Sequence, residues 1–252
     1  MLTHEQVEQF DRDGFLRLSA VFDDVTCKRM LERVVEITVL HARGDRHGTA
    51  LVLPEANLSE RAKDPSARPE QLVSKVFRLH RDTVFADVAR DPAILDRVAE
   101  LIAPQLDCFL SQFIFKNPNA WGQPWHQDSY YFPFEPARPI VGAWVAVTEA
   151  TLQNGCLHVV PGSHREPVHE HVADRRPNAN IGYVEIVDHD MSASVPVLME
   201  PGDLLLFDSH LMHRSTDNES DGIRAAMVYH YAASGTRQLH DNLVNDWVTV
   251  RP

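Results

Sequence analysis

The sequence has few cysteines, and none of them lie close together. Cys27, Cys108 and Cys156 are the only three in 252 residues, and no CxxC pair is present. Disulfide scaffolds and cysteine-bound zinc sites need cysteines that pair at defined spacings. The sequence therefore predicts neither, and the isolated thiols favour a reducing, cytoplasmic setting.

Long apolar runs and an excess of positive charge are also missing. No stretch reaches the roughly 20 apolar residues that a membrane-spanning helix needs. The opening segment MLTHEQVEQFDRDG has neither the basic nor the apolar part of a secretory signal. With 24 basic against 36 acidic residues, the formal net charge is -12. Nucleic acids and anionic membranes bind basic surfaces, so we expect neither as a partner.

The first third of the chain is predicted to be mainly helical. Thr3 and Gln6 form a capping box, and Asp23 or Asp24 is placed to cap a longer helix. Residues 45–70 carry scattered Pro, Asp, Ser and Asn with weak periodicity, which indicates an exposed loop that could act as a lid. Two further helical patterns follow, RDTVFADVAR and PAILDRVAELIAP.

From Leu106 onward the pattern changes to short strands. Segments rich in β-branched and aromatic residues are separated by Gly, Pro, Asn and Asp, with no helical pattern between them. This arrangement predicts an antiparallel sandwich or barrel. We expect one domain over residues 1–252, with a mainly helical part and loop at 1–104, a strand core at 105–235 and a C-terminal tail at 236–252.

The stretch QPWHQDSYYFPF places His126 and Asp128 two residues apart. On an extended strand, residues i and i+2 point the same way, so an imidazole and a carboxylate can face one point while Gln127 faces away. Taken alone, such a pair is most often a polar strand end. A firmly held metal ion needs a third ligand from elsewhere in the chain.

A candidate third ligand lies at the end of GDLLLFDSHLMH, which is predicted to be a buried strand. His210 and His213 are three residues apart, so only one of them faces the core. If the polar stretch STDNESDG is a hairpin tip, Arg224 lies opposite His213 on the returning strand. Taken singly, His213 could be a hydrogen-bonded core histidine and Arg224 a surface cation.

The combination carries more weight than its members. Two histidines and one carboxylate with open positions are typical of non-haem iron(II) and oxygen chemistry. The planar fork of an arginine grips a carboxylate through two hydrogen bonds. The pattern therefore indicates an iron site beside a pocket for a co-substrate that carries a carboxylate.

These segments resemble the phytanoyl-CoA dioxygenase-like family of iron(II)/2-oxoglutarate oxygenases. The resemblance runs from about residue 75 to about residue 234 and rests on WHQDSYYFPF, GAWVAVTEATLQNGCLHVVPGSH and PGDLLLFDSHLMHRSTDNESDGIRAAMVYHY. It implies a double-stranded β-helix, a cupin-like jelly roll, with helices packed on one side. It also implies iron(II), 2-oxoglutarate and O2 as the reacting partners.

The resemblance assigns roles to residues by position. The implied iron ligands are His126, Asp128 and His213. The implied 2-oxoglutarate contacts are Arg224, Ser215, Trp144, Gln112 and Lys75. Tyr130, Tyr131 and Phe132 follow the first ligands and are candidates for the substrate wall. Three of these residues have an ordinary alternative role. Trp144 could be a core residue, Gln112 could satisfy buried backbone groups, and Lys75 could be a surface charge.

The predicted activity is oxidation of an unactivated C–H bond in a small organic molecule, chiefly hydroxylation, with decarboxylation of 2-oxoglutarate to succinate. Asp128 stands where related halogenases have a glycine or alanine, which favours hydroxylation over halogenation. No basic cluster suited to coenzyme A phosphates is evident. Two alternatives stay open: a cupin-type metal enzyme that does not use 2-oxoglutarate, and a catalytically silent family member. PVHEHV, with His169 and His171, is expected to be a surface loop near the active-site mouth.

Overall fold

The main structural element is an eight-stranded sheet. A computed structural model describes residues 1–252, and its strands run antiparallel in the order β1-β11-β6-β13-β4-β3-β2, with β15 also paired to β4. The strands are β1 (Phe15–Leu18), β2 (Leu51–Pro54), β3 (Val73–Phe77), β4 (Leu106–Lys116), β6 (Ile140–Ala146), β11 (Leu204–Asp208), β13 (Arg224–Ala233) and β15 (Val248–Arg251).

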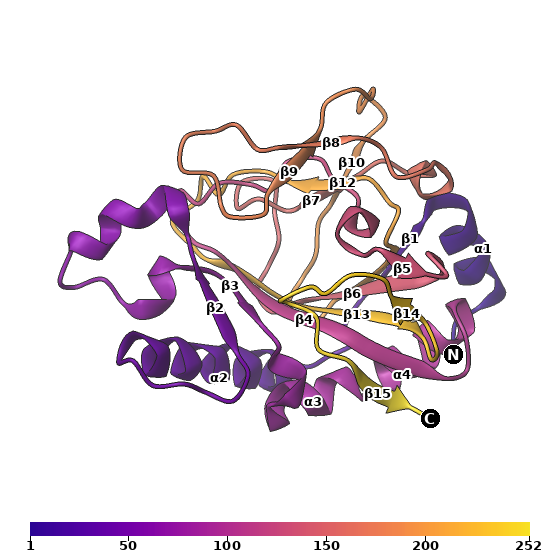
Figure 1. Cartoon of the computed structure of the whole chain (residues 1–252), viewed down its shortest axis with the longest axis horizontal. Coiled ribbons are helices and arrows are strands. Elements are labelled where there is room, and N and C mark those ends of the chain that lie inside the picture. The colour runs from indigo at the N-terminus through magenta and orange to yellow at the C-terminus, as the bar shows by residue number, and fades with distance from the viewer.

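A smaller sheet faces the inner side of this main sheet (Figure 1). It has the order β10-β7-β12, and two short ribbons, β14-β5 and β8-β9, accompany it. Their bounds are β5 (Phe134–Glu135), β7 (Leu157–Val159), β8 (His171–Ala173), β9 (Val184–Ile186), β10 (Val195–Val197), β12 (His213–Ser215) and β14 (Arg237–Gln238). Two opposed antiparallel sheets joined in this way make a double-stranded β-helix, as predicted.

Helices cover the outer face of the main sheet, where α2 and α3 lie beneath β4 in Figure 1. The helices are α1 (His4–Asp13), α2 (Asp24–Ala42), α3 (Thr83–Ala89) and α4 (Pro92–Leu101). Thr3 and Gln6 form the predicted capping box of α1, and the Asp23 side chain accepts a hydrogen bond from the Thr26 amide to start α2. Both predictions were local, and both are confirmed.

Strand alternation divides the interior into two cores. On β13, Ala225, Met227, Tyr229 and Tyr231 belong to the outer core beneath the helices. The residues that alternate with these point toward the smaller sheet, where Arg224, Val228 and His230 line a cavity. Neighbouring side chains on a strand point to opposite faces. One nearly continuous run of buried residues therefore supplies both the outer core and the lining of the cavity.

Several boundaries differ from the predictions. Residues 45–70 are not simply a loop: they contain β2 and the 3-10 helix η1 (Ala56–Lys63), and a second 3-10 helix, η2 (Pro69–Leu72), begins at their end. β2 adds an edge strand beside β3. The expected tail at 236–252 contributes β15, which pairs with β4. The core of strands therefore draws on the whole chain, because edge positions accept short strands with little periodicity.

The predicted hairpin after His213 is also wrong. β12 pairs with β7 in the smaller sheet, whereas β13 pairs with β4 and β6 in the main sheet. The polar stretch between them carries the chain from one sheet to the other. His210 lies outside both strands, so the two histidines do not share one strand. No helix is long and apolar enough to cross a membrane.

We predict that two tyrosines of β13 anchor α3 to the main sheet. The Tyr229 hydroxyl donates to the Phe85 carbonyl oxygen at 2.8 Å, and the Tyr231 hydroxyl donates to the Ala89 carbonyl oxygen at 2.9 Å. Tyr229→Phe should lower the free energy of unfolding by about 1 kcal/mol, because a buried hydrogen bond is lost. Denaturant unfolding measures the change, and Tyr130→Phe, at an exposed tyrosine, is the control; equal loss in both variants would refute the anchor.

Candidate iron and 2-oxoglutarate site

A short backbone pairing brings the two predicted histidine ligands together. The His126 amide donates to the His213 carbonyl oxygen at 2.9 Å, and the His213 amide donates to the His126 carbonyl oxygen at 3.0 Å. This reciprocal pair extends the ladder of β12, where the Ser215 amide donates to the Gln123 carbonyl oxygen. The two imidazole rings lie 4.1 Å apart, measured between centroids.

Both histidines present the same ring nitrogen. His126 Nδ1 bonds the Pro124 carbonyl oxygen at 2.8 Å, and His213 Nδ1 bonds the Leu211 carbonyl oxygen at 2.9 Å. A carbonyl can only accept, so Nδ1 carries the proton and Nε2 keeps a free lone pair. Burial, and then the neighbouring His126, lower the pKa of His213 to about 4. His213 is therefore neutral at neutral pH, as a metal ligand must be.

Asp128 reaches the same point by a different route from the one predicted. Gln127 is extended, but Asp128 opens the 3-10 helix η4 (Asp128–Tyr131), so the pair does not lie on one strand. Asp128 Oδ1 is 3.6 Å from His126 Nε2 and 3.8 Å from His213 Nε2. Burial would raise the pKa of Asp128, but the neighbouring His213 and His230 and the hydrogen bonds of His126 and His230 hold it well below its usual range.

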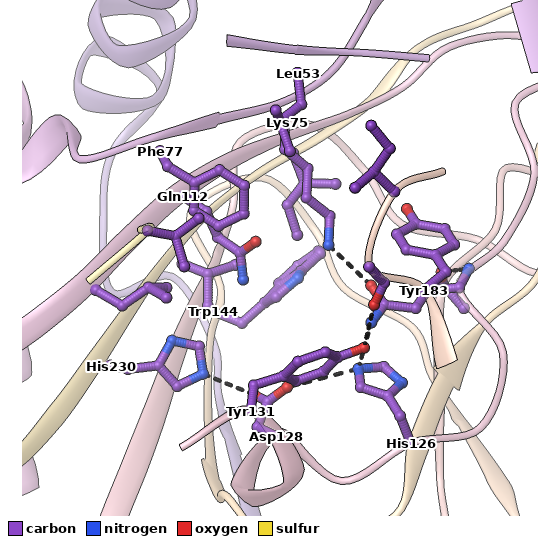
Figure 2. A pocket seen from close by; sticks show the side chains of 18 of the residues that line it. Leu53, Lys75, Phe77, Gln112, His126, Asp128, Tyr131, Trp144, Tyr183 and His230 are labelled. Atoms are coloured by element: carbon purple, nitrogen blue, oxygen red, sulfur yellow. Dashed lines mark hydrogen bonds and ion pairs between the residues drawn. The ribbon is translucent and has the colours of Figure 1, made fainter. Parts of the chain in front are cut away.

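His230 was missed in the sequence and fixes the carboxylate. Its Nε2–H donates to Asp128 Oδ2 at 2.7 Å, which leaves Oδ1 facing the histidines (Figure 2). A hydrogen bond of this kind orients a ligating carboxylate. The sequence signal was its position in IRAAMVYHY, where it shares the inner face of β13 with Arg224.

The donor atoms of His126, Asp128 and His213 all lie within 4.8 Å of one another, and all three residues are buried. Two neutral imidazoles and one ionised carboxylate are a fitting donor set for iron(II). Gln123 Nε2 donates to the His126 Nε2 lone pair at 2.9 Å, and Lys75 Nζ donates to Gln123 Oε1 at 2.9 Å. Lys75 thus reaches the site through Gln123.

Arg224 lies buried in the same cavity. Its Nη2 donates to the Gly155 carbonyl oxygen at 3.0 Å, while Nε and Nη1 are buried without any partner. Burial lowers the pKa of Arg224 to about 10, so it stays a cation at neutral pH. The guanidinium lies 5.6 Å from the centre of the Trp144 ring. Two unpaired donors on a buried cation fit the carboxylate of a co-substrate.

Lys116 lies opposite Arg224 across the β4–β13 ladder and was also missed. Its Nζ donates to Ser215 Oγ at 2.9 Å and to the Thr216 carbonyl oxygen at 2.7 Å. Burial, and then the charge of Arg224, lower the pKa of Lys116 well below its usual value. Lys116 therefore holds the Ser215 hydroxyl in place, and Arg224 supplies the positive charge.

A glycine in the segment Asn154-Gly155-Cys156 explains how Arg224 and Lys116 fit together. Gly155 has a φ of 84°, and a Cβ there would lie 2.4 Å from the Thr216 carbonyl oxygen and 2.6 Å from Lys116 Cδ. Only glycine allows this conformation and this close approach. Its carbonyl oxygen is then free to receive Arg224.

All five predicted 2-oxoglutarate residues line one cavity of about 350 Å³ together with the three predicted ligands. Gln112 and Trp144 lie between Lys75 and His230 in Figure 2. Gln112 Oε1 is buried without a partner. The sequence thus identified residues far apart in the chain that the fold brings together.

The predicted substrate wall is partly wrong. Tyr131 and Phe132 line the cavity, and the Tyr131 hydroxyl donates to the Gly182 carbonyl oxygen. Tyr130 does not line it: its side chain is 44% exposed and stacks on His171. The 3-10 turn rotates Tyr130 outward, which strand alternation could not predict.

The fold and the site define a non-haem iron(II)/2-oxoglutarate-dependent dioxygenase, with O2 as the oxidant. The chain belongs to the phytanoyl-CoA dioxygenase (PhyH) family, whose model matches residues 10–226.

Two curated relatives support this membership. The peroxisomal phytanoyl-CoA dioxygenase of Bos taurus is 31% identical over 92% of this chain and 69% of its own length. The probable phytanoyl-CoA dioxygenase of Caenorhabditis elegans is 30% identical over 92% of this chain and 76% of its own length.

Solved structures share the fold. EctD from S. alaskensis has a TM-score of 0.72 at 22% identity, covering 97% of this chain and 83% of that one. The epimerase SnoN, solved with Fe3+ and alpha ketoglutarate, has a TM-score of 0.67 at 19% identity, covering 93% and 84%.

We predict that His230 positions the Asp128 carboxylate. His230→Phe should weaken iron(II) binding by about 10- to 100-fold, the usual effect of losing a hydrogen bond to a metal ligand. Anaerobic titration with iron(II) measures the affinity. His158→Phe, at a histidine outside the cavity, is the control. Unchanged affinity in His230→Phe, with an intact fold by circular dichroism, would show that the hydrogen bond has no positioning role.

Proposed function

We propose that His126, Asp128 and His213 hold the iron, and that Arg224 and Ser215 bind the far carboxylate of 2-oxoglutarate. The observation that carries this proposal is the buried Arg224 guanidinium, which has two donors without a partner in the cavity of the triad. An unpaired buried cation is costly, so an anionic ligand of matching shape stabilises it. This favours the oxygenase over the cupin-type alternative that does not use 2-oxoglutarate.

The residues around the triad prepare it for binding. The backbone carbonyls of Pro124 and Leu211 hold the imidazoles in the ligating tautomer, and His230 turns one Asp128 oxygen toward them. When bound, iron(II) would supply O2 activation for the oxidation of a C–H bond, coupled to the conversion of 2-oxoglutarate to succinate and CO2. Gln112, Trp144 and Lys75 complete the wall of the co-substrate pocket.

We propose that the substrate is a mainly hydrocarbon molecule without charge on the part that enters the cavity. Apolar side chains that line it come from the β2–β3 edge, from β4, from the residue after η4 and from the C-terminal segment. These are Leu51, Leu53, Phe77, Leu110, Phe132, Leu243 and Val244. Such a wall binds apolar surface and excludes water from the reacting centre. The activity that fits best is hydroxylation of an unactivated C–H bond.

The co-substrate assignment predicts a spectroscopic change in one variant. Anaerobic addition of iron(II) and 2-oxoglutarate should give the weak visible metal-to-ligand charge-transfer band in the wild type. Arg224→Ala should lose this band at moderate 2-oxoglutarate, because the distal carboxylate has lost its cation, while iron(II) binding persists. Arg214→Ala, on β12 but outside the cavity, is the control. If Arg224→Ala titrates like the wild type, the assignment is wrong.

The substrate assignment predicts which compounds increase the rate of succinate formation. The panel contains uncharged hydrocarbon-rich compounds, their amine and carboxylate counterparts, and an acyl-CoA. We expect the uncharged compounds to stimulate succinate formation. Leu51→Asp should then lower kcat/KM for the stimulating compound at least tenfold, because a charge enters the apolar wall, with 2-oxoglutarate affinity unchanged, since Leu51 pairs with Phe77. Leu152→Asp, at an exposed leucine, is the control. Stimulation by charged compounds alone would overturn the substrate class.

A further inference from the structure

A second cluster of metal-binding side chains lies outside the cavity. Glu166 follows the 3-10 helix η5 (Ser163–Arg165), His169 lies three residues later in an irregular segment, and His189 follows β9. Glu166 Oε2 is 2.8 Å from His169 Nε2 and 3.1 Å from His189 Nε2. The donor atoms of all three residues lie within 4.8 Å of one another. None of these residues lines the iron and 2-oxoglutarate cavity.

We propose that Glu166, His169 and His189 bind a zinc ion. The donor set of two imidazoles and one carboxylate, with a fourth position left for water, is one that zinc accepts in tetrahedral geometry. Tetrahedral bonds of about 2.0–2.1 Å place neighbouring donor atoms a little over 3 Å apart, close to the two separations present here. Both histidines offer Nε2 to the same point.

The two imidazoles of the cluster converge on one carboxylate. His169 and His189 meet edge to face, with ring centroids 5.1 Å apart, so their Nε2 atoms converge on Glu166 from different directions. Each of the three side chains is partly exposed, which gives an ion access from solvent. Asp188 and Asp190 flank His189 in the sequence and add negative charge to a chain with a net charge of -12.

The zinc ion would close a loop that carries part of the active-site wall. The segment between Glu166 and His189 contains β8, β9 and the cavity residues Ile181, Gly182 and Tyr183. A cross-link at its two ends removes conformational freedom from the loop. PVHEHV is thus not the simple surface loop expected from the sequence: His171 is buried and starts β8.

Gln127 connects the segment between Glu166 and His189, called the zinc loop below, to the iron ligands. Its Oε1 accepts from the His169 amide at 2.8 Å, and its Nε2 donates to the Pro167 carbonyl oxygen at 3.1 Å. Since Gln127 lies between His126 and Asp128, the loop is held directly against the backbone of the iron site. Bound zinc would therefore keep both the substrate wall and this backbone in place.

The test counts zinc ions on the full chain after removal of metal with a chelator. At low micromolar free Zn2+, the wild type should bind two equivalents, one of them at the iron triad. His126→Ala/His213→Ala should bind one, and adding Glu166→Gln or His189→Ala to it should lower the remaining affinity at least 100-fold. Glu170→Gln, at an exposed neighbouring glutamate, is the control. Equilibrium dialysis with elemental analysis gives the stoichiometry.

A second measurement is independent of activity and of the iron site. Zn2+ should slow proteolysis within residues 166–189 in His126→Ala/His213→Ala and leave it unchanged when Glu166→Gln is added. Circular dichroism checks that each variant is folded; if the triad variant does not fold, the wild type and Glu166→Gln are compared, with two equivalents expected against one. A single equivalent in the wild type that Glu166→Gln retains, or full zinc binding in Glu166→Gln, would overturn the second site while leaving the oxygenase assignment untouched.

Discussion

The central pair of strands, β4 and β13, imposes the constraint on which the rest of the structure depends. Both strands are buried on both faces, so their two-residue alternation must serve two environments at once. One set of side chains, including Phe113 and Met227, packs beneath the helices. The other set places Gln112, Lys116 and Arg224 in the cavity. A slip of one residue in this pairing would put charged groups into the outer core and apolar groups into the site.

Burying two basic side chains side by side shapes the chemistry of the cavity. Arg224 and Lys116 oppose each other in the ladder, and the acids Glu55 and Asp217 favour the charged form of Lys116. The burial raises the pKa of Glu55, which weakens that compensation. Arg224 forms no ion pair with an acid, and its Nε and Nη1 are left for a bound anion. Affinity for a dicarboxylate and instability of the empty pocket are two effects of the same arrangement.

The sequence predicted what depends on local pattern. The caps at Thr3 and Asp23 need only neighbouring residues, and the alternating segments after Leu106 identified the strands. It failed where tertiary context decides: β2 and β15 are short edge strands, and the polar stretch after Ser215 looks like a hairpin tip but crosses between sheets. Arg224 was placed in the right cavity for the wrong reason. Lys116 and His230 were missed because each stands in a run of apolar residues typical of ordinary core.

The reciprocal backbone pair between His126 and His213 has a kinetic meaning. These residues are 87 positions apart, and the pairing joins the segment before η4 to β12 of the smaller sheet. Contacts of such sequence separation form late, because the entropy of closing the intervening chain must first be overcome. Neither segment by itself can therefore hold both histidine ligands, so the metal-binding arrangement depends on this long-range closure.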